Sequence, residues 1–281
     1  MPLITKKVAF TASHYYWYAG WNGEENKARF RECSNRNGHG HNYQVEVTLE
    51  GEISSATGMI INFSDLTPLL NRGIVEPLDH RNLNLEVPYF QDKNPTLENI
   101  TLYIWKALFS QGYGENIKLS HLKVMENEDI YAEYDGNEQD MPTLTRRYTF
   151  SAAHKLWNLA MTDEQNKACF GKCTHLHGHN YILDVTVSGS LDPQTGMITD
   201  IVLLDKIIQE RILLFVDHQY LDEDLPWLAG KTSTVENLVQ IIFDQLVSEV
   251  SSPAFLDRVR LVETENNWAE CSTPEVLKSR V

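Results

Sequence analysis

The chain has 281 residues, enough for one or two domains, and its 42% hydrophobic content can form a sizeable core. Its net charge of −15 argues against nucleic acid or an anionic membrane as the main partner, because phosphate contacts need basic surface. Four unevenly placed cysteines, no signal-like start and no apolar run of about 20 residues together predict a cytoplasmic protein with reduced thiols.

In chain order, the first half predicts two strands, two helices and two further strands. Two helices are expected, one starting near Ser64 and running toward Val75, and one following Thr96 and ending near Gly112. The strands are expected at Leu3 to Ser13, Tyr43 to Leu49, about Lys118 to Glu126, and Ile130 to Tyr134. This order predicts an α+β unit, an antiparallel four-stranded sheet with two helices on one face, whose bare edges favour association.

The second half repeats the motifs of the first. The offset is 140 residues up to Cys33 and its counterpart Cys173, and 138 afterwards, so the second copy is two residues shorter between its cysteine and the following histidine. The repeat predicts two tandem domains, 1–136 and 143–281, joined by a polar linker at 137–142. The matching motifs are Phe10 to His14 with Phe150 to His154, His39 to Tyr43 with His177 to Tyr181, Thr57 to Ile60 with Thr195 to Ile198, and Thr96 to Asn99 with Thr234 to Asn237.

Three histidines recur together in each copy. His39 and His41 are two residues apart, so both side chains point to the same face of a strand. His14 ends the neighbouring predicted strand, about 4.8 Å away. Three imidazoles with an open fourth position are a common catalytic zinc site. We therefore predict one zinc ion per copy, held in the second copy by His154, His177 and His179.

A cysteine and an Asp-His pair accompany the histidines. Cys33 could act as a nucleophile or general base once an imidazole draws off its proton, and the pair Asp79 and His80 could assist it. The same cysteine could instead be a fourth zinc ligand, which would close the site. Glu126 ends a predicted strand and could accept two hydrogen bonds from a pterin or guanine edge. The corresponding residues of the second copy are Cys173, Asp217, His218 and Glu263.

Taken together, these motifs resemble the 6-pyruvoyltetrahydropterin synthase family, which includes the 6-carboxytetrahydropterin synthases of queuosine biosynthesis. The resemblance implies two tandem tunnelling-fold domains, zinc, and 7,8-dihydroneopterin triphosphate as substrate. It implies that the cysteine is the proton-abstracting base, that the Asp-His pair completes a triad and that the late glutamate anchors the pterin. Thr96 and Glu98, with Thr234 and Glu236, are the further substrate-binding residues that it implies.

The two copies resemble different branches of this family. Five residues separate Cys33 from His39, as in the biopterin-type enzymes, whereas three separate Cys173 from His177, as in the queuosine-type enzymes. Leu97 departs from the second threonine that biopterin-type members often have. We expect a zinc-dependent lyase that gives 6-carboxytetrahydropterin, with 6-pyruvoyltetrahydropterin or a bifunctional chain as alternatives.

A non-catalytic pterin- or purine-binding protein is the rival hypothesis. It predicts that both cysteines ligate the metal and leave no open position. The resemblance also implies a homo-oligomer with sites between subunits, and three chains presenting six domains would supply a three-fold assembly.

Overall fold

The computed structural model describes residues 1–136, 141–250 and 254–274. The described residues form two compact units: one contains Met1–Leu144 together with Ser188–Asp200, and the other contains Thr145–Val187 and the rest of the chain from Ile201. The segment Ser188–Asp200 therefore comes from the second repeat in sequence but belongs to the first unit. Residues 137–140 of the predicted linker lie outside the described part.

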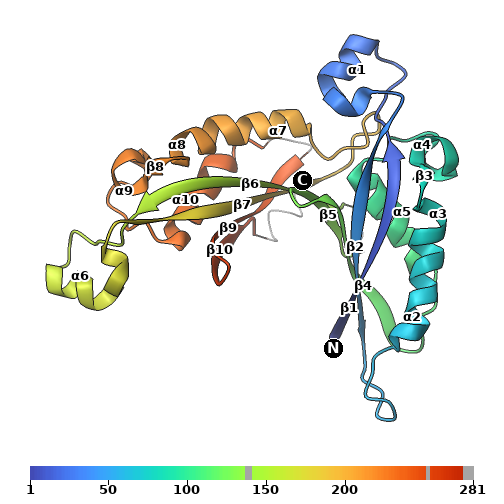
Figure 1. The fold of residues 1–281 in the computed structure, drawn as a ribbon, viewed down its shortest axis with the longest axis horizontal. Coiled ribbons are helices and arrows are strands. Elements are labelled where there is room, and N and C mark those ends of the chain that lie inside the picture. Colours follow the sequence, from blue (N-terminus) through green and yellow to red (C-terminus); the bar gives the residue numbers. More distant parts are fainter. Residues whose placement is uncertain (137–140, 251–253, 275–281) are drawn as a thin grey trace. The chain divides into compact units, whose positions relative to one another are not determined.

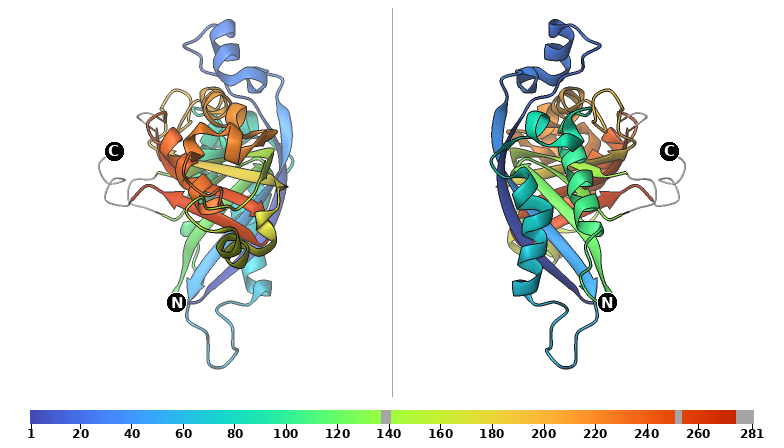
Figure 2. Two further views of the ribbon diagram at one scale, coloured as in Figure 1. Left: turned by 90° about the vertical axis from the view of Figure 1, so that its left-hand side faces the viewer. Right: turned by 90° about the vertical axis from the view of Figure 1, so that its right-hand side faces the viewer.

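The first copy contains the predicted four-stranded antiparallel sheet, in the order β5-β4-β2-β1. A short strand that we did not predict, β3, pairs in parallel with the outer edge of β1. Helices α2 to α5 lie along one face of the sheet, whereas α1 lies beyond the ends of β1 and β2 (Figure 1; Figure 2, right). The strands are β1 Leu3–His14, β2 His39–Gly51, β3 Arg81–Asn82, β4 Ile117–Asn127 and β5 Ile130–Tyr134. The helices are α1 Gly23–Phe30, α2 Phe63–Leu70, α3 Glu76–Leu78, α4 Leu83–Glu86 and α5 Leu97–Phe109.

The second copy repeats this arrangement, with strand order β10-β9-β7-β6 and a short β8 paired in parallel with β6. Helix α10 packs against β9 and β10, as α5 packs against β4 and β5. The predicted α+β class, with a four-stranded sheet and helices in each copy, is confirmed. The strands are β6 Thr143–His154, β7 His177–Gly189, β8 Gln219–Tyr220, β9 Ala254–Thr264 and β10 Asn267–Ser272. The helices are α6 Asp163–Phe170, α7 Ile201–Ile208, α8 Leu214–Val216, α9 Leu221–Asp224 and α10 Val235–Leu246.

Local sequence explains where the main helices begin. The Thr96 side chain accepts a hydrogen bond from Asn99 N and caps α5, as predicted. The cap of α2 is Asn62, not Ser64 as predicted, because the Asn62 side chain accepts from Ser64 N. Leucine and isoleucine recur every three or four residues along α5, which buries one stripe of the helix against the sheet. Among the helices of the described residues, none is long and apolar enough to cross a bilayer.

Candidate metal centres

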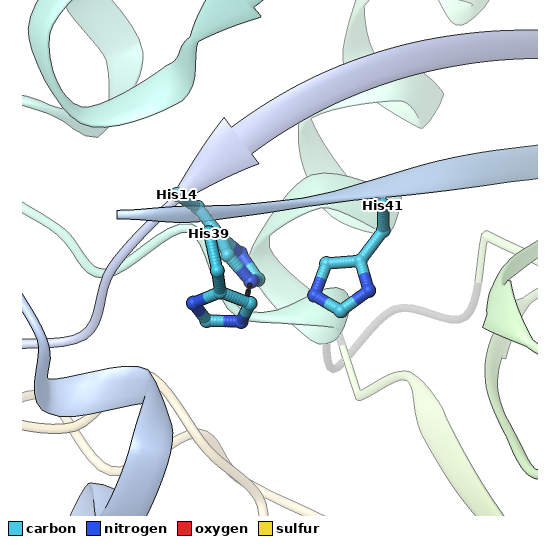
Figure 3. A group of neighbouring side chains, drawn as sticks. All are labelled: His14, His39 and His41. Atoms are coloured by element: carbon cyan, nitrogen blue, oxygen red, sulfur yellow. Dashed lines mark hydrogen bonds between the residues drawn. The ribbon is translucent and has the colours of Figure 1, made fainter. Parts of the chain in front are cut away.

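The three predicted histidines of the first copy meet at the ends of β1 and β2. His14 pairs with His39 in the antiparallel register, and His41 lies two residues further along the same strand. Their ring nitrogens lie within 4.8 Å of one another (Figure 3). The Nε2 atoms of His14 and His39 are 3.1 Å apart. Two nitrogens bound to one tetrahedral zinc at 2.0–2.1 Å would be roughly 3.3 Å apart, so this spacing suits a shared metal ion.

The protein orients the deepest histidine of each cluster. His14 is fully buried, and its Nδ1 lies 3.1 Å from the carbonyl oxygen of Pro95. A carbonyl only accepts, so Nδ1 carries the proton and Nε2 keeps a lone pair for a metal. His154 makes the same contact with the carbonyl of Ser233 at 2.9 Å. His177 Nδ1 is similarly held, 2.8 Å from the carbonyl of His175.

The imidazoles of His14 and His41 are neutral at pH 7, as metal ligands must be. Burial and the neighbouring His39 lower the pKa of His14 to about 3. Burial and His39 also lower the pKa of His41 to about 4. Three buried ring nitrogens, His39 Nδ1, His41 Nε2 and His154 Nε2, have no hydrogen-bond partner. Buried polar atoms without partners are costly, and a metal ion would satisfy those that face the clusters.

The second cluster has the same arrangement. The ring nitrogens of His154, His177 and His179 lie within 4.8 Å of one another. Both copies therefore hold a group of three histidines that can bind a metal ion, and neither cysteine is part of either group. The side chains of the two unrepeated histidines belong to neither group: His175 is exposed, and His121 faces Glu133.

The predicted cysteine and late glutamate lie beside the first cluster. Cys33 Sγ is 3.8 Å from His39 Nε2, and Glu126 Oε1 is 3.6 Å from His41 Nε2. Burial and the charge of Glu126 raise the pKa of the Cys33 thiol to about 11. Two phenols that we had not assigned are also present. Tyr43 places its hydroxyl 3.3 Å from His14 Nδ1, and burial raises the pKa of the Tyr16 phenol, as does the charge of Glu126. Recurrence of tyrosine at Tyr181 was the available signal for Tyr43, whereas Tyr16 has no repeated counterpart.

In the second copy, four predicted residues line one open cavity of about 510 Å³: Cys173, Thr234, Glu236 and Glu263. Trp268, which the sequence did not single out, also lines it. Glu263 Oε1 lies 3.6 Å from His154 Nε2 and 3.9 Å from His179 Nε2. The cavity therefore adjoins the histidine cluster.

The Asp-His pairs lie at the sheet edge, on the residues just before β3 and β8. His80 Nδ1 is 2.7 Å from Asp79 Oδ2, and Asp79 Oδ1 accepts from Thr11 N. These contacts lower the pKa of Asp79, with the Thr11 hydrogen bond as the largest cause. His80 is 80% exposed, and no described contact joins it to Cys33. In the second copy, His218 lines a different cavity from Cys173.

Both pair histidines adopt the left-handed backbone region, with φ of 55° at His80 and 58° at His218. Few residues other than glycine adopt this region, and histidine is one of those that do so more often. Each backbone N–H donates to a strand carbonyl at 2.6 Å, from His80 to Thr11 and from His218 to Ser151. The two copies thus maintain the same strained geometry.

Thr96 and Glu98, predicted to bind substrate, have partners within the first unit. Thr96 Oγ1 donates to the carbonyl of Gly196 at 2.7 Å, and Glu98 Oε1 accepts from Ile198 N at 3.0 Å. Both side chains are buried by these contacts. Their counterparts Thr234 and Glu236 are half-buried and exposed, respectively. Substrate contact by these residues stays a prediction.

Comparison with known proteins is consistent with this geometry. A family model described as 6-pyruvoyl tetrahydropterin synthase matches residues 3–137 and again 143–274. The chain is 48% identical over 105 residues to the 6-pyruvoyl tetrahydrobiopterin synthase of Pongo abelii, covering 37% of this chain and 72% of that protein. It is 37% identical over 95 residues to a protein of Archaeoglobus fulgidus assigned as a 6-carboxy-5,6,7,8-tetrahydropterin synthase. This match covers 34% of this chain and 73% of that protein.

A solved structure, the Caenorhabditis elegans 6-pyruvoyl tetrahydropterin synthase, aligns with a TM-score of 0.45 and 37% identity, covering 48% of this chain and 96% of its own. The family model covers nearly the whole chain in two consecutive matches, each containing one complete histidine cluster. The chain therefore belongs to the 6-pyruvoyl tetrahydropterin synthase family, with two tandem copies of the family domain.

Proposed function

We propose that this protein is a zinc-dependent lyase that acts on 7,8-dihydroneopterin triphosphate. The observation that carries the proposal is the same in both copies: three histidines that can hold a metal, with a glutamate carboxylate within 4 Å of a histidine nitrogen. In the first copy a thiol adjoins the same cluster. A metal ion, a base and a carboxylate at one site suit the removal of a carbon-bound proton next to a side-chain oxygen of the substrate.

Zinc bound by the histidines would polarise the side-chain oxygens of the substrate and, by its charge, favour the ionised thiol. The Cys33 thiolate would then remove the adjacent carbon-bound proton. Glu126 would accept hydrogen bonds from the N–H groups of the pterin ring. Tyr43 and the Pro95 carbonyl would keep the His14 ring in position throughout.

For the first copy, elimination of triphosphate to give 6-pyruvoyltetrahydropterin is the favoured reaction. Its five-residue spacing between Cys33 and His39 resembles that of the biopterin-type enzymes. Relatives named 6-pyruvoyl tetrahydrobiopterin synthases are 39–48% identical over less than half of this chain. The second copy favours our original expectation, 6-carboxytetrahydropterin, because its cysteine spacing is two residues shorter. The two halves of the chain thus suggest two different candidate products.

The test is to incubate the purified, zinc-loaded protein with 7,8-dihydroneopterin triphosphate and identify the pterins by mass. Cys33→Ala and Cys173→Ala, made separately, assign each product to its copy, and His121→Ala is a control outside both clusters. We expect turnover that chelation abolishes, with one product lost in each cysteine variant if the copies differ. Substrate returned unchanged by the zinc-loaded wild type would refute the lyase.

A further inference from the structure

Tyr16 is a buried tyrosine beside the first histidine cluster. It lies two residues after His14 and is 6% exposed. Its ring meets the His14 ring edge-on, with 4.9 Å between the ring centroids, and meets the Phe30 ring in the same way at 5.8 Å. Edge-on contacts with two rings hold the phenol in one place next to the metal ligand.

The main chain fixes Tyr16 next to the proposed catalytic thiol. Tyr16 N donates to the carbonyl of Cys33 at 2.7 Å, and the Cys33 side chain packs against the hydrophobic cluster that contains the Tyr16 ring. Burial raises the pKa of the phenol, and so do the charges of Glu126 and Cys33. A charge acts strongly only over a short distance, so the phenol lies close to the thiol and to the carboxylate proposed to anchor the pterin.

The second copy shows which space a side chain at this position faces. Leu156 N donates to the carbonyl of Cys173 at 2.7 Å, so Leu156 is the counterpart of Tyr16. Leu156 lines the open cavity of about 510 Å³ together with Cys173 and Glu263. By this correspondence, Tyr16 faces the substrate space of the first site. The same position therefore has a hydroxyl in the first copy and a purely apolar side chain in the second.

The Tyr16 hydroxyl makes no hydrogen bond to a described residue. Tyr113, which is buried to a similar degree at 8% exposed, donates its hydroxyl to the carbonyl of Leu108 at 2.8 Å. A buried hydroxyl without a partner is uncommon, because its desolvation is not offset by a new hydrogen bond. A ligand with an acceptor oxygen at this place would supply the missing bond.

We propose that Tyr16 contacts the substrate of the first copy and donates a hydrogen bond from its hydroxyl to an oxygen of the pterin side chain. This role rests on the proposed function, which places those oxygens beside the histidines. A phenol is protonated at neutral pH, and its hydrogen bond strengthens as the acceptor oxygen gains negative charge. Leu156 cannot make this contact, so the first copy selects a hydroxylated side chain more strongly than the second.

Binding of two pterins that differ in their side chain tests this contact without catalysis. Neopterin has a hydroxylated side chain, whereas 6-methylpterin has none. The background is the zinc-loaded full chain with Cys33→Ala and Glu263→Ala, which removes the thiol of the first copy and the proposed pterin anchor of the second. Fluorescence titration measures the Kd of each pterin. We expect Tyr16→Phe to weaken neopterin by roughly tenfold or more and to change 6-methylpterin by less than about twofold.

Tyr113→Phe is the matched control, because it also removes one buried phenolic hydroxyl. Tyr113 lies near the C-terminal end of α5, the opposite end from Thr96. This variant should bind both pterins as the background does. Because the thiol is absent from the background, an effect of Tyr16→Phe on binding cannot pass through Cys33.

Turnover gives a second measurement in the Cys173→Ala variant, which keeps only the thiol of the first copy. There, Tyr16→Phe should lower kcat/KM for 7,8-dihydroneopterin triphosphate by roughly tenfold or more, because the contact strengthens as the side-chain oxygen becomes charged. An unchanged kcat/KM would overturn the contact.

The binding results separate this contact from the proposed lyase. Equal weakening of both pterins by Tyr16→Phe, or no weakening of neopterin, would overturn the contact and leave the lyase in place. A background that binds neither pterin would also overturn the contact. Substrate returned unchanged by the wild type, together with weaker neopterin binding in Tyr16→Phe, would refute the lyase alone.

Discussion

At the scale of single residues, the histidines are the part of the site most directly predictable from sequence. The same-face position of His39 and His41 follows from the two-residue period of a strand, and the structure places both beside His14. The carbonyls that orient the rings could not be predicted, because Pro95 and Ser233 are about 80 residues away from the histidines they contact.

Removing one ligand should empty one cluster and leave the other filled. We expect wild-type protein to bind about two zinc ions per chain and His41→Ala about one, because two protein ligands hold zinc much more weakly than three. Metal analysis after exhaustive dialysis measures this. His121→Ala, whose ring faces Glu133 away from the cluster, should keep both ions. Two ions retained in His41→Ala would contradict the assignment of this ligand.

The Cys33 thiol should react slowly in metal-free protein at neutral pH. Its pKa is raised to about 11 by burial and Glu126, so at pH 8 it is ionised roughly a hundredfold less often than a thiol with a pKa of 9. Because only the thiolate is alkylated, the rate should rise as the pH increases toward 11. Mass mapping after iodoacetamide treatment compares Cys33 with the exposed Cys169. Faster labelling of Cys33 at pH 8 would show that its pKa is not raised.

At the scale of elements, the sequence predicted the long strands and helices but not the short ones. Alternating side chains and the Thr96 cap are local signals, and both were interpreted correctly. The two-residue strands β3 and β8 depend on pairing with β1 and β6, respectively, so their own sequences carry no signal. The misplaced cap of α2 arose because Asn62 and Ser64 are both good capping residues two positions apart.

The glycine between the paired histidines should be needed for close packing of the strands. A Cβ on Gly178 would lie 2.9 Å from the carbonyl oxygen of Ala152, closer than real contacts allow. Gly178→Ala should therefore push β7 from β6, lower the free energy of unfolding by about 1–3 kcal/mol and weaken zinc binding by the second cluster.

Gly23→Ala is the matched control for this change. Gly23 begins α1, and a Cβ there would meet nothing within 4 Å. The free energy of unfolding of Gly23→Ala should stay the same as that of the wild type or rise slightly, because alanine favours the helix. Equal unfolding midpoints for the two variants in urea would contradict the close-packing argument.

At the scale of the whole molecule, the repeat in the sequence predicted two copies of one fold, and the family matches agree with it. It did not predict that Ser188–Asp200 would belong to the first unit, because the sequence of a loop does not reveal which of two similar surfaces it contacts. The motif Thr-Gly-Met-Ile recurs in both copies, yet Met197 is buried whereas Met59 is exposed in the described structure.

The proposed lyase needs an open metal position at each cluster, and the local structure around bound zinc tests this most directly. X-ray absorption of protein loaded with two zinc ions per chain should show only nitrogen and oxygen neighbours at about 2.0–2.1 Å, from three imidazoles and a water. A sulfur neighbour at about 2.3 Å would identify Cys33 or Cys173 as a ligand. That result would close the site and contradict the proposed lyase.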